Sequence, residues 1–216
     1  IEKLLYVDPE TGEPILYEKD IPFYKHQDRL LLAENRQIDP DSLDDFLAMD
    51  GYSALARVLE EISPDEVIQE VLDSGLRGRG GAGFPTGLKW QIAGRQTAQP
   101  KYIVCNADEG DPGAFMDRGI IEGNPHRVIE GMCIGARAIG ASQGFVYVRY
   151  EYPIAVKRIN QAVEQAREAG LLGENILGSD FSFDLKVVMG AGAFVCGEET
   201  ALIASLEGRK GEPVQR

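Results

Sequence analysis

From residue 101 onward, short apolar segments alternate with longer amphipathic ones. The short runs resemble buried strands, and the stretches that follow them have helical spacing. This alternation predicts right-handed crossovers and therefore an α/β fold, a Rossmann-like parallel sheet with helices on both faces. Such sheets bind ligands outside the carboxyl ends of their strands. Strands are expected at 102–105, 145–148 and 185–189, and helices at 128–139, 153–169 and 198–206.

The first 62 residues are rich in Asp, Pro and Tyr and show no sustained helical period, so they are expected to form an irregular arm with short helices near 43–47 and 52–59. Ser63-Pro64-Asp65-Glu66 then has the pattern of a capping box and predicts a helix through about Asp73. We therefore expect two parts, an arm over 1–62 and an α/β domain over 63–216. The chain begins without Met and stops directly after a helix, so we expect a piece truncated at its C-terminal end.

Charge and cysteine usage exclude several classes of function. The net charge of −13 and the isoelectric point near 4.6 would repel a phosphate backbone, so nucleic acid is not an expected partner. No apolar run is long enough for a membrane span and no signal peptide is present, which favours a cytoplasmic protein without membrane insertion. Cys105, Cys133 and Cys196 are widely separated, so no metal or iron–sulfur site is expected within this segment.

A glycine-rich segment, residues 74–90, is the first candidate site. Six of its seventeen residues are glycine, and Arg77, Arg79 and Lys89 add positive charge to an acidic chain. Glycine backbone amides flanked by cations are suited to holding phosphate. Gly78, Gly80 and Gly83 also match GxGxxG, but a Rossmann fingerprint follows a strand, whereas here a helix leads into the loop. A flexible connector is the simpler alternative.

Two further loops follow predicted strands. Residues 106–113 (Asn-Ala-Asp-Glu-Gly-Asp-Pro-Gly) place carboxylates and an amide where ligand hydroxyls are expected, although a solvated turn or a magnesium site would use the same residues. Residues 190–200 change from small side chains to Glu198 and Glu199 at a helix start, where carboxylates also serve as helix caps. Cys196 could contact a planar ring, but a buried thiol is the commoner explanation.

The chain shows no pattern for a nucleophile, an acid–base pair or a metal set, and we assign no role to His26 or His126. Its chemistry is therefore expected to come from a bound cofactor, which the protein orients and tunes. The three loops together favour a flavin enzyme.

The order of these motifs resembles the NADH-oxidising flavoprotein subunit of respiratory complex I and of soluble NAD-linked hydrogenases and formate dehydrogenases. The similarity covers about residues 20–216 and is carried by 74–90, 106–118 and 190–208. The arm, around 22–25, 38–40 and 51–52, is most similar to the soluble, hydrogenase-associated branch, which includes electron-bifurcating enzymes.

The resemblance implies a diaphorase-type oxidoreductase in which FMN carries out the hydride chemistry and no side chain is itself catalytic. Glu199 is expected to position NADH as well as to contact the flavin, Phe84 to stack on adenine, and Asp111 to reach NADH. Phe194 replaces a Tyr of complex I relatives, Asp111 replaces a Glu, and Ile92 stands where some relatives have a second aromatic residue. The residues expected around FMN are Gly78, Arg79, Gly80, Gly81, Lys89, Asn106, Asp108, Glu109, Phe194, Gly197, Glu198 and Glu199.

The resemblance also implies parts outside this segment. Family members continue into a region with a [4Fe-4S] cluster, and some carry an upstream [2Fe-2S] domain. The implied partners are iron–sulfur subunits of a soluble complex, namely a small [2Fe-2S] subunit and a hydrogenase or formate dehydrogenase subunit. Two other hypotheses remain open from the residues alone. One is a non-catalytic nucleotide-binding assembly module, and the other is a magnesium-dependent phosphate-binding enzyme.

Overall fold

The computed structural model describes residues 4–190 and 193–214, which fall into two units, Ile1–Ala33 and Glu34–Arg216. The first unit holds an antiparallel pair of two-residue strands with Tyr6 opposite Ile15, followed by two short helical turns. The sequence-based boundary after residue 62 stays a prediction. The elements of this unit are β1 (Tyr6–Val7), β2 (Pro14–Ile15), the 3-10 turn η2 (Glu18–Asp20) and α1 (Pro22–Lys25).

The second unit contains a three-stranded sheet of order β3-β4-β5, with both pairs parallel. Its register places Val104 beside Phe145 and Phe145 beside Lys186, so the three carboxyl ends lie at one edge. The predicted α/β fold with a parallel sheet is confirmed. The strands are β3 (Tyr102–Ala107), β4 (Gln143–Arg149) and β5 (Asp184–Gly190).

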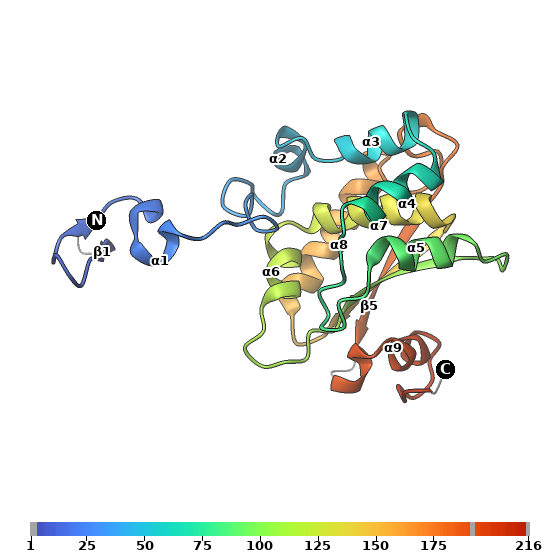
Figure 1. The fold of residues 1–216 in the computed structure, drawn as a ribbon. Helices are drawn as coiled ribbons and strands as arrows, with labels where there is room; N and C mark the ends of the chain where they lie inside the picture. Colours follow the sequence, from blue (N-terminus) through green and yellow to red (C-terminus); the bar gives the residue numbers. More distant parts are fainter. Residues whose placement is uncertain (1–3, 191–192, 215–216) are drawn as a thin grey trace. The chain divides into compact units, whose positions relative to one another are not determined.

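Helices supply the rest of this unit. In the view of Figure 1, β5 leads to α9 on one side, while α3, α4, α7 and α8 gather on the other. The helices are α2 (Leu43–Ala48), α3 (Ser53–Glu60), α4 (Pro64–Asp73), α5 (Thr86–Gly94), α6 (Met116–Gly123), α7 (Pro125–Ile139), α8 (Pro153–Glu168) and α9 (Glu199–Leu206), with 3-10 turns η3 (Ile176–Gly178) and η4 (Phe194–Gly197).

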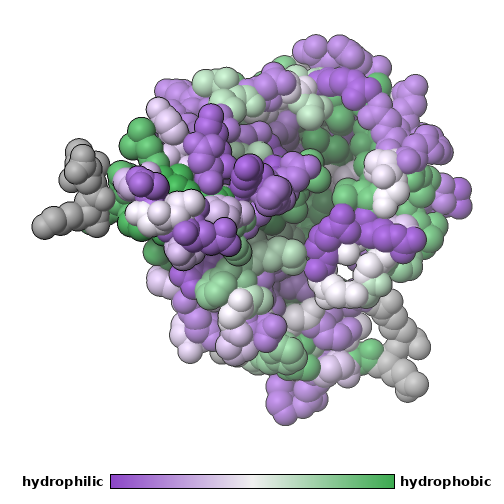
Figure 2. All heavy atoms as spheres, turned by 60° about the vertical axis from the view of Figure 1, so that its left-hand side comes forward, coloured by the Kyte–Doolittle hydropathy of each residue, from purple (hydrophilic) through white to green (hydrophobic). Residues whose placement is uncertain are grey.

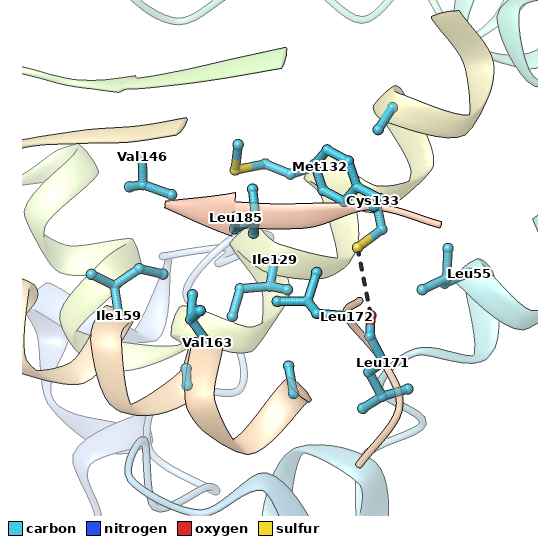
Figure 3. Packing of buried hydrophobic residues seen from close by; sticks show 14 of the residues in the cluster. Leu55, Ile129, Met132, Cys133, Val146, Ile159, Val163, Leu171, Leu172 and Leu185 are labelled. Atoms are coloured by element: carbon cyan, nitrogen blue, oxygen red, sulfur yellow. Dashed lines mark hydrogen bonds between the residues drawn. The ribbon is translucent and has the colours of Figure 1, made fainter. Parts of the chain in front are cut away.

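The main core lies between the sheet and the pair α7 and α8. Figure 3 shows Ile129 of α7 next to Leu185 of β5, with Ile159 of α8 farther along the same core, and each of these residues is fully buried. Alternation along β4 sends Val146 and Val148 into this core, as expected of a strand whose helix-covered face is dry. The Cys133 thiol donates to the carbonyl of Leu171 across 3.9 Å, so this cysteine is part of the packing.

The opposite face of the sheet is covered at its carboxyl end by η4 and α9. Tyr147 of β4 packs with Cys196 and Leu202, and its hydroxyl lies 2.9 Å from the hydroxyl of Ser205. Toward the amino end of the same face, Tyr102 is 48% exposed. Helical cover on this face is therefore concentrated beside the carboxyl edge, where the sequence places the ligand site.

Local capping explains why several helices begin where they do. Ser63 accepts from the Glu66 amide while the Glu66 carboxylate accepts from the Ser63 amide, so the predicted capping box is confirmed. Asn124 caps α7 by accepting from the Arg127 amide, and Gly140 ends that helix with φ of 74°. These caps fix the start of α4 and both ends of α7, which packs against the sheet.

Helices α2 and α3, which the sequence places in the arm, contribute to the same core as α7. Phe46 and Tyr52 pack around His126, whose Nδ1 lies 3.0 Å from the Tyr52 hydroxyl and whose Nε2 lies 3.0 Å from the side-chain Oε1 of Gln165. Burial lowers the pKa of His126 below its ordinary value. This histidine is a buried packing and hydrogen-bonding residue, consistent with its having no assigned role.

Helix α5 packs against α4 at a point that leaves no room for a side chain. A Cβ added to Gly87 would lie 2.6 Å from the backbone nitrogen of Leu72 and 2.8 Å from its Cγ. The two helices flank the glycine-rich segment, so this close contact fixes the separation of the two ends of that loop.

We therefore predict that Gly87→Ala destabilises the fold by about 1–3 kcal/mol, because the added methyl group would push the two helices apart. The matched control is Gly131→Ala in exposed mid-α7, where a Cβ meets nothing within 4 Å. That change should stabilise by roughly 0.5–1 kcal/mol, since alanine favours helix. Urea unfolding of both variants measures the difference, and equal free energies of unfolding would contradict the packing argument.

Within residues 4–190 and 193–214, no helix is both long and apolar enough to cross a lipid bilayer. Hydrophilic residues occupy much of the face drawn in Figure 2, with hydrophobic ones exposed between them.

Candidate functional site

The loops that follow β3 and β5 meet at the carboxyl edge of the sheet. The Asn106 side-chain amide donates to the carbonyl of Gly197 across 2.8 Å. A Cβ on Gly197 would lie 3.4 Å from the Asp108 carbonyl oxygen and 3.8 Å from its carboxylate. The structure therefore brings together three of the residues that the sequence analysis selected in two separate loops.

Asp108 is buried without having its hydrogen-bonding capacity used. Its side chain is 1% exposed, and both carboxylate oxygens lack a hydrogen-bond partner among the described residues. The nearest cation is the Arg149 guanidinium, 3.6 Å from Oδ1. Burial raises the pKa of Asp108, while the charge of Arg149 acts in the opposite direction. A buried carboxylate is costly unless donors reach it, so these oxygens are placed to accept hydrogen bonds from a ligand.

Glu109 has a structural task in addition to its expected place near the flavin. Its carboxylate accepts from the amides of Met116, at 2.8 Å, and Arg118, at 3.1 Å, and so caps the start of α6. The Tyr152 hydroxyl donates to its backbone carbonyl. Burial, and then the nearby charge of Glu109, raise the pKa of Asp117 to about 6. Asp111 lies on the exposed part of this loop.

The glycine-rich segment forms a narrow loop whose interior amides remain available. The Gly78 amide donates to the Phe84 carbonyl across 2.9 Å, and the Arg77 guanidinium donates to the Gly83 carbonyl across 3.0 Å. Among the described residues, the amides of residues 79–83 donate to no other residue. Since Gly80 and Gly81 also have open space where a Cβ would stand, a phosphate group has both donors and room here.

Exposed side chains surround this loop. Lys89 is exposed in α5, and within the described part of the chain it makes no ion pair with a carboxylate. Arg79 is exposed on the loop itself. Phe84 is 43% exposed and Ile92 is 50% exposed, so both present apolar surface to a ligand. In the view of Figure 1, the segment between α4 and α5 extends toward the end of the sheet where β5 stops.

In the third loop, the structure distinguishes the two acids. One carboxylate oxygen of Glu198 accepts from the amides of Thr200 and Ala201, both at 3.0 Å, and so caps α9. Helix capping, one of the roles that the sequence left open for Glu198, is thus present in the structure. Glu199 is the first residue of the helix and is exposed, as is Phe194. Ala191 and Gly192 lie outside the described residues.

Arg149 is the site residue that sequence reasoning missed. It ends β4, pairs with Asp108, and donates to Glu151 across 2.7 Å. The signal was present, because ligands are expected after every strand and Arg149 directly follows the predicted strand 145–148. In contrast, no group of three His, Cys, Asp or Glu side chains converges as a metal site in the portion of the chain described.

The arrangement as a whole suits a phosphorylated ligand that also carries hydroxyl or amide donors. Open loop amides and cations can bind the phosphate, while Asn106 and Asp108 offer a polar edge beside η4. Phe194, 73% exposed, adds an aromatic surface next to that edge.

Comparisons with known proteins give the same ligand class. Residues 71–216 match the family described as the Nuo51 FMN-binding domain. The chain is 59% identical over 192 residues to the NADP-reducing hydrogenase subunit HndC of Solidesulfovibrio fructosivorans, which covers 89% of this chain and 39% of that protein. It is 47% identical over 183 residues to a subunit of the NADH-quinone oxidoreductase of Escherichia coli (strain K12), covering 84% of this chain and 41% of that protein.

A solved structure shares the fold. An NAD+-reducing [NiFe]-hydrogenase in the H2-reduced state superposes with a TM-score of 0.71 at 36% identity, covering 88% of this chain and 30% of that one. The chain thus spans less than half the length of these relatives.

The glycine-rich, acidic and third loops all lie inside the matched residues 71–216. The resemblance inferred from the order of these motifs is confirmed. The chain belongs to the family of the Nuo51 FMN-binding domain.

Proposed function

We propose that this chain is the nucleotide-binding part of an NADH:acceptor oxidoreductase, in which hydride passes between NAD(H) and FMN and electrons then move to or from iron–sulfur clusters. Family membership supports the flavin. The observation that carries the site assignment is the buried Asp108 carboxylate, whose two oxygens have no hydrogen-bond partner among the described residues. The donors it lacks are groups that FMN possesses, and so the residues present fit this cofactor.

The flavin-facing roles divide by chemistry. Gly78, Gly80 and Gly81 would offer backbone amides to the FMN phosphate, with Arg79 and Lys89 supplying charge. The acidic loop (Asn106, Asp108 and Glu109) and the third loop (Phe194, Gly197, Glu198 and Glu199) would surround the rest of the cofactor. The Asn106 side chain joins these two loops through its hydrogen bond to the Gly197 carbonyl.

The NADH-facing roles fall to exposed residues on the same loops. Phe84 would stack on adenine, because an exposed aromatic ring offers a large apolar area for stacking. Asp111 and Glu199 would contact the ribose hydroxyls, which carboxylates accept well. Glu198 caps α9, and the exposed Glu199 that follows it would position NADH.

Bound FMN supplies the redox chemistry, because it accepts two electrons with a hydride and can pass them on singly. The protein orients the rings, excludes water around Asp108, and keeps negative charge beside the nicotinamide ribose. We assign no general acid or base. The side chains of this chain act by binding and orientation.

The wider assembly is part of the proposal. Relatives are named as subunits of a hydrogenase and of an NADH-quinone oxidoreductase. We infer partners that carry iron–sulfur clusters, such as a small [2Fe-2S] subunit and a hydrogenase or formate dehydrogenase subunit. We place the [4Fe-4S] cluster of the whole protein outside residues 1–216.

An anaerobic titration tests this function. The full-length protein should show flavin absorbance that bleaches on addition of NADH. Flavin that remains oxidised would favour a non-catalytic nucleotide-binding module. Absence of flavin, together with a requirement for magnesium, would favour a phosphate-binding enzyme acting at the acidic loop.

A further inference from the structure

Arg149, the last residue of β4, packs against the acidic loop. The Arg149 side chain is 11% exposed; its Nη1 lies 3.6 Å from the Asp108 carboxylate, and its Nη2 donates to Glu151 across 2.7 Å. A Cβ on Gly110 would lie 2.8 Å from the Arg149 guanidinium and 2.7 Å from the Phe194 ring. The guanidinium is therefore packed against the loop beside η4.

The distance between the two charges matters as much as their signs. At 3.6 Å, the guanidinium offers Asp108 charge compensation without a close hydrogen bond, so both carboxylate oxygens keep their lone pairs. A bidentate pair would instead have occupied both oxygens. This geometry stabilises an ionised carboxylate that can still accept from a ligand.

We propose that Arg149 is a positioning residue for flavin binding, which holds Asp108 in its ionised form and leaves both of its oxygens open to hydroxyl or amide donors of FMN. The proposal rests on the proposed function. It assigns Arg149 no contact with the cofactor, because the effect passes through Asp108.

The charged and titratable groups that face Asp108 determine the pH dependence. Arg149 lies at the end of β4 and Glu151 two residues beyond it, and Tyr147 approaches from within that strand; Cys196 of η4 packs against Tyr147. Burial raises the pKa of Asp108, Arg149 lowers it, and Glu151 raises it. Without Arg149 the carboxylate would take up a proton at higher pH and would then accept fewer hydrogen bonds.

Arg149→Gln tests this directly. FMN dissociation constants are measured by fluorescence quenching with the full-length apoprotein at about pH 8, 7 and 5.5. The variant should bind about tenfold more weakly than wild type at neutral pH, the scale of one charge-assisted hydrogen bond. The ratio to wild type should grow as the pH falls, and taking this ratio removes the titration of the FMN phosphate itself. Arg149→Lys should restore most of the affinity.

A second variant should shift the pH dependence of FMN binding in the opposite direction, and it does not remove a buried side chain. Glu151→Gln removes the negative charge that raises the pKa of Asp108 and that competes with it for the guanidinium, so FMN binding should persist to lower pH than in wild type. The matched control is Arg167→Gln, which removes an Arg–Asp pair at the first residue of β5, away from the carboxyl edge. It should leave FMN affinity within about twofold.

A double-mutant cycle separates this role from simple packing. In the Asp108→Asn background, Arg149→Gln should change FMN affinity less than about twofold, because there is no longer a charge to hold. A large further loss in that background would overturn the proposal, as would a wild-type pH profile in Arg149→Gln. If wild type binds FMN and these variants do not differ from it, this inference alone fails; if wild type binds no FMN, the proposed function fails with it.

Discussion

Lys89→Glu should release the flavin. The FMN dissociation constant is expected to rise about 100-fold or more, because a cation–phosphate contact worth about 1.5–3 kcal/mol is replaced by repulsion. The available amides of residues 79–83 would still face the phosphate, but with a carboxylate beside them. Flavin content per polypeptide after gel filtration, together with a fluorescence titration, measures the change.

The control for this charge reversal is Lys186→Glu. Lys186 is also exposed, but it lies in β5 toward the amino end of the sheet, beside Phe145. Lys186→Glu changes the net charge of the chain by the same amount as Lys89→Glu, and this variant should retain the flavin. Unchanged flavin retention in Lys89→Glu would refute the phosphate role of this lysine, and equal loss in both variants would show an effect of overall charge.

Glu199→Lys should impair the reaction with NADH while leaving FMN bound. Reduction of bound flavin by NADH is expected to slow by about 10–100-fold at limiting NADH, because the hydrogen bonds to a ribose are lost and a cation takes their place. Flavin content should stay close to wild type. The capping carboxylate of α9 belongs to Glu198, so the helix itself should survive the change. Stopped-flow bleaching of the flavin band against NADH concentration gives the measurement.

Glu168→Lys provides the comparison for Glu199→Lys. Glu168 is the exposed last residue of α8, next to Arg167, which pairs with the first residue of β5. The substitution reverses the same charge away from the carboxyl edge and should leave both flavin content and reduction rate unchanged. Parallel loss of FMN and of NADH reduction in Glu199→Lys would contradict the division of roles.

The sequence predicted well those helices and strands whose ends depend on neighbouring residues. The helix after Ser63 and the helix before Gly170 begin or end within a residue or two of the expected positions, since caps and left-handed glycines are visible in short segments. The three strands were likewise expected, because continuous apolar runs between turns are typical of parallel sheets.

In the described part of the second unit, α5 and α6 were not predicted, because the contacts that stabilise them come from outside the helix itself. Helix α6 has Phe115 at its N-cap and receives its cap from Glu109, further back along the chain. Helix α5 follows Pro85 without a side-chain cap and depends on the close contact of Gly87 with Leu72. Both interactions reach beyond the single turn of sequence in which a helix cap is normally recognised.

The candidate site was predictable in outline and incomplete in detail. Motif order identified the loops, but residue type alone did not distinguish Glu198, which caps a helix, from Glu199 beside it. The burial of Asp108 and the contribution of Arg149 depend on strand register, which sequence patterns leave open.

The hydrogen bond from Asn106 to Gly197 joins residues that are 91 positions apart. During synthesis on the ribosome, the glycine-rich loop and the acidic loop therefore emerge long before the third loop, which completes the candidate site. Contacts of such long sequence separation form late, because the intervening chain must first be ordered. Capture of the cofactor would thus mark a nearly finished fold, and a nascent chain halted before β5 would leave Asn106 without this partner.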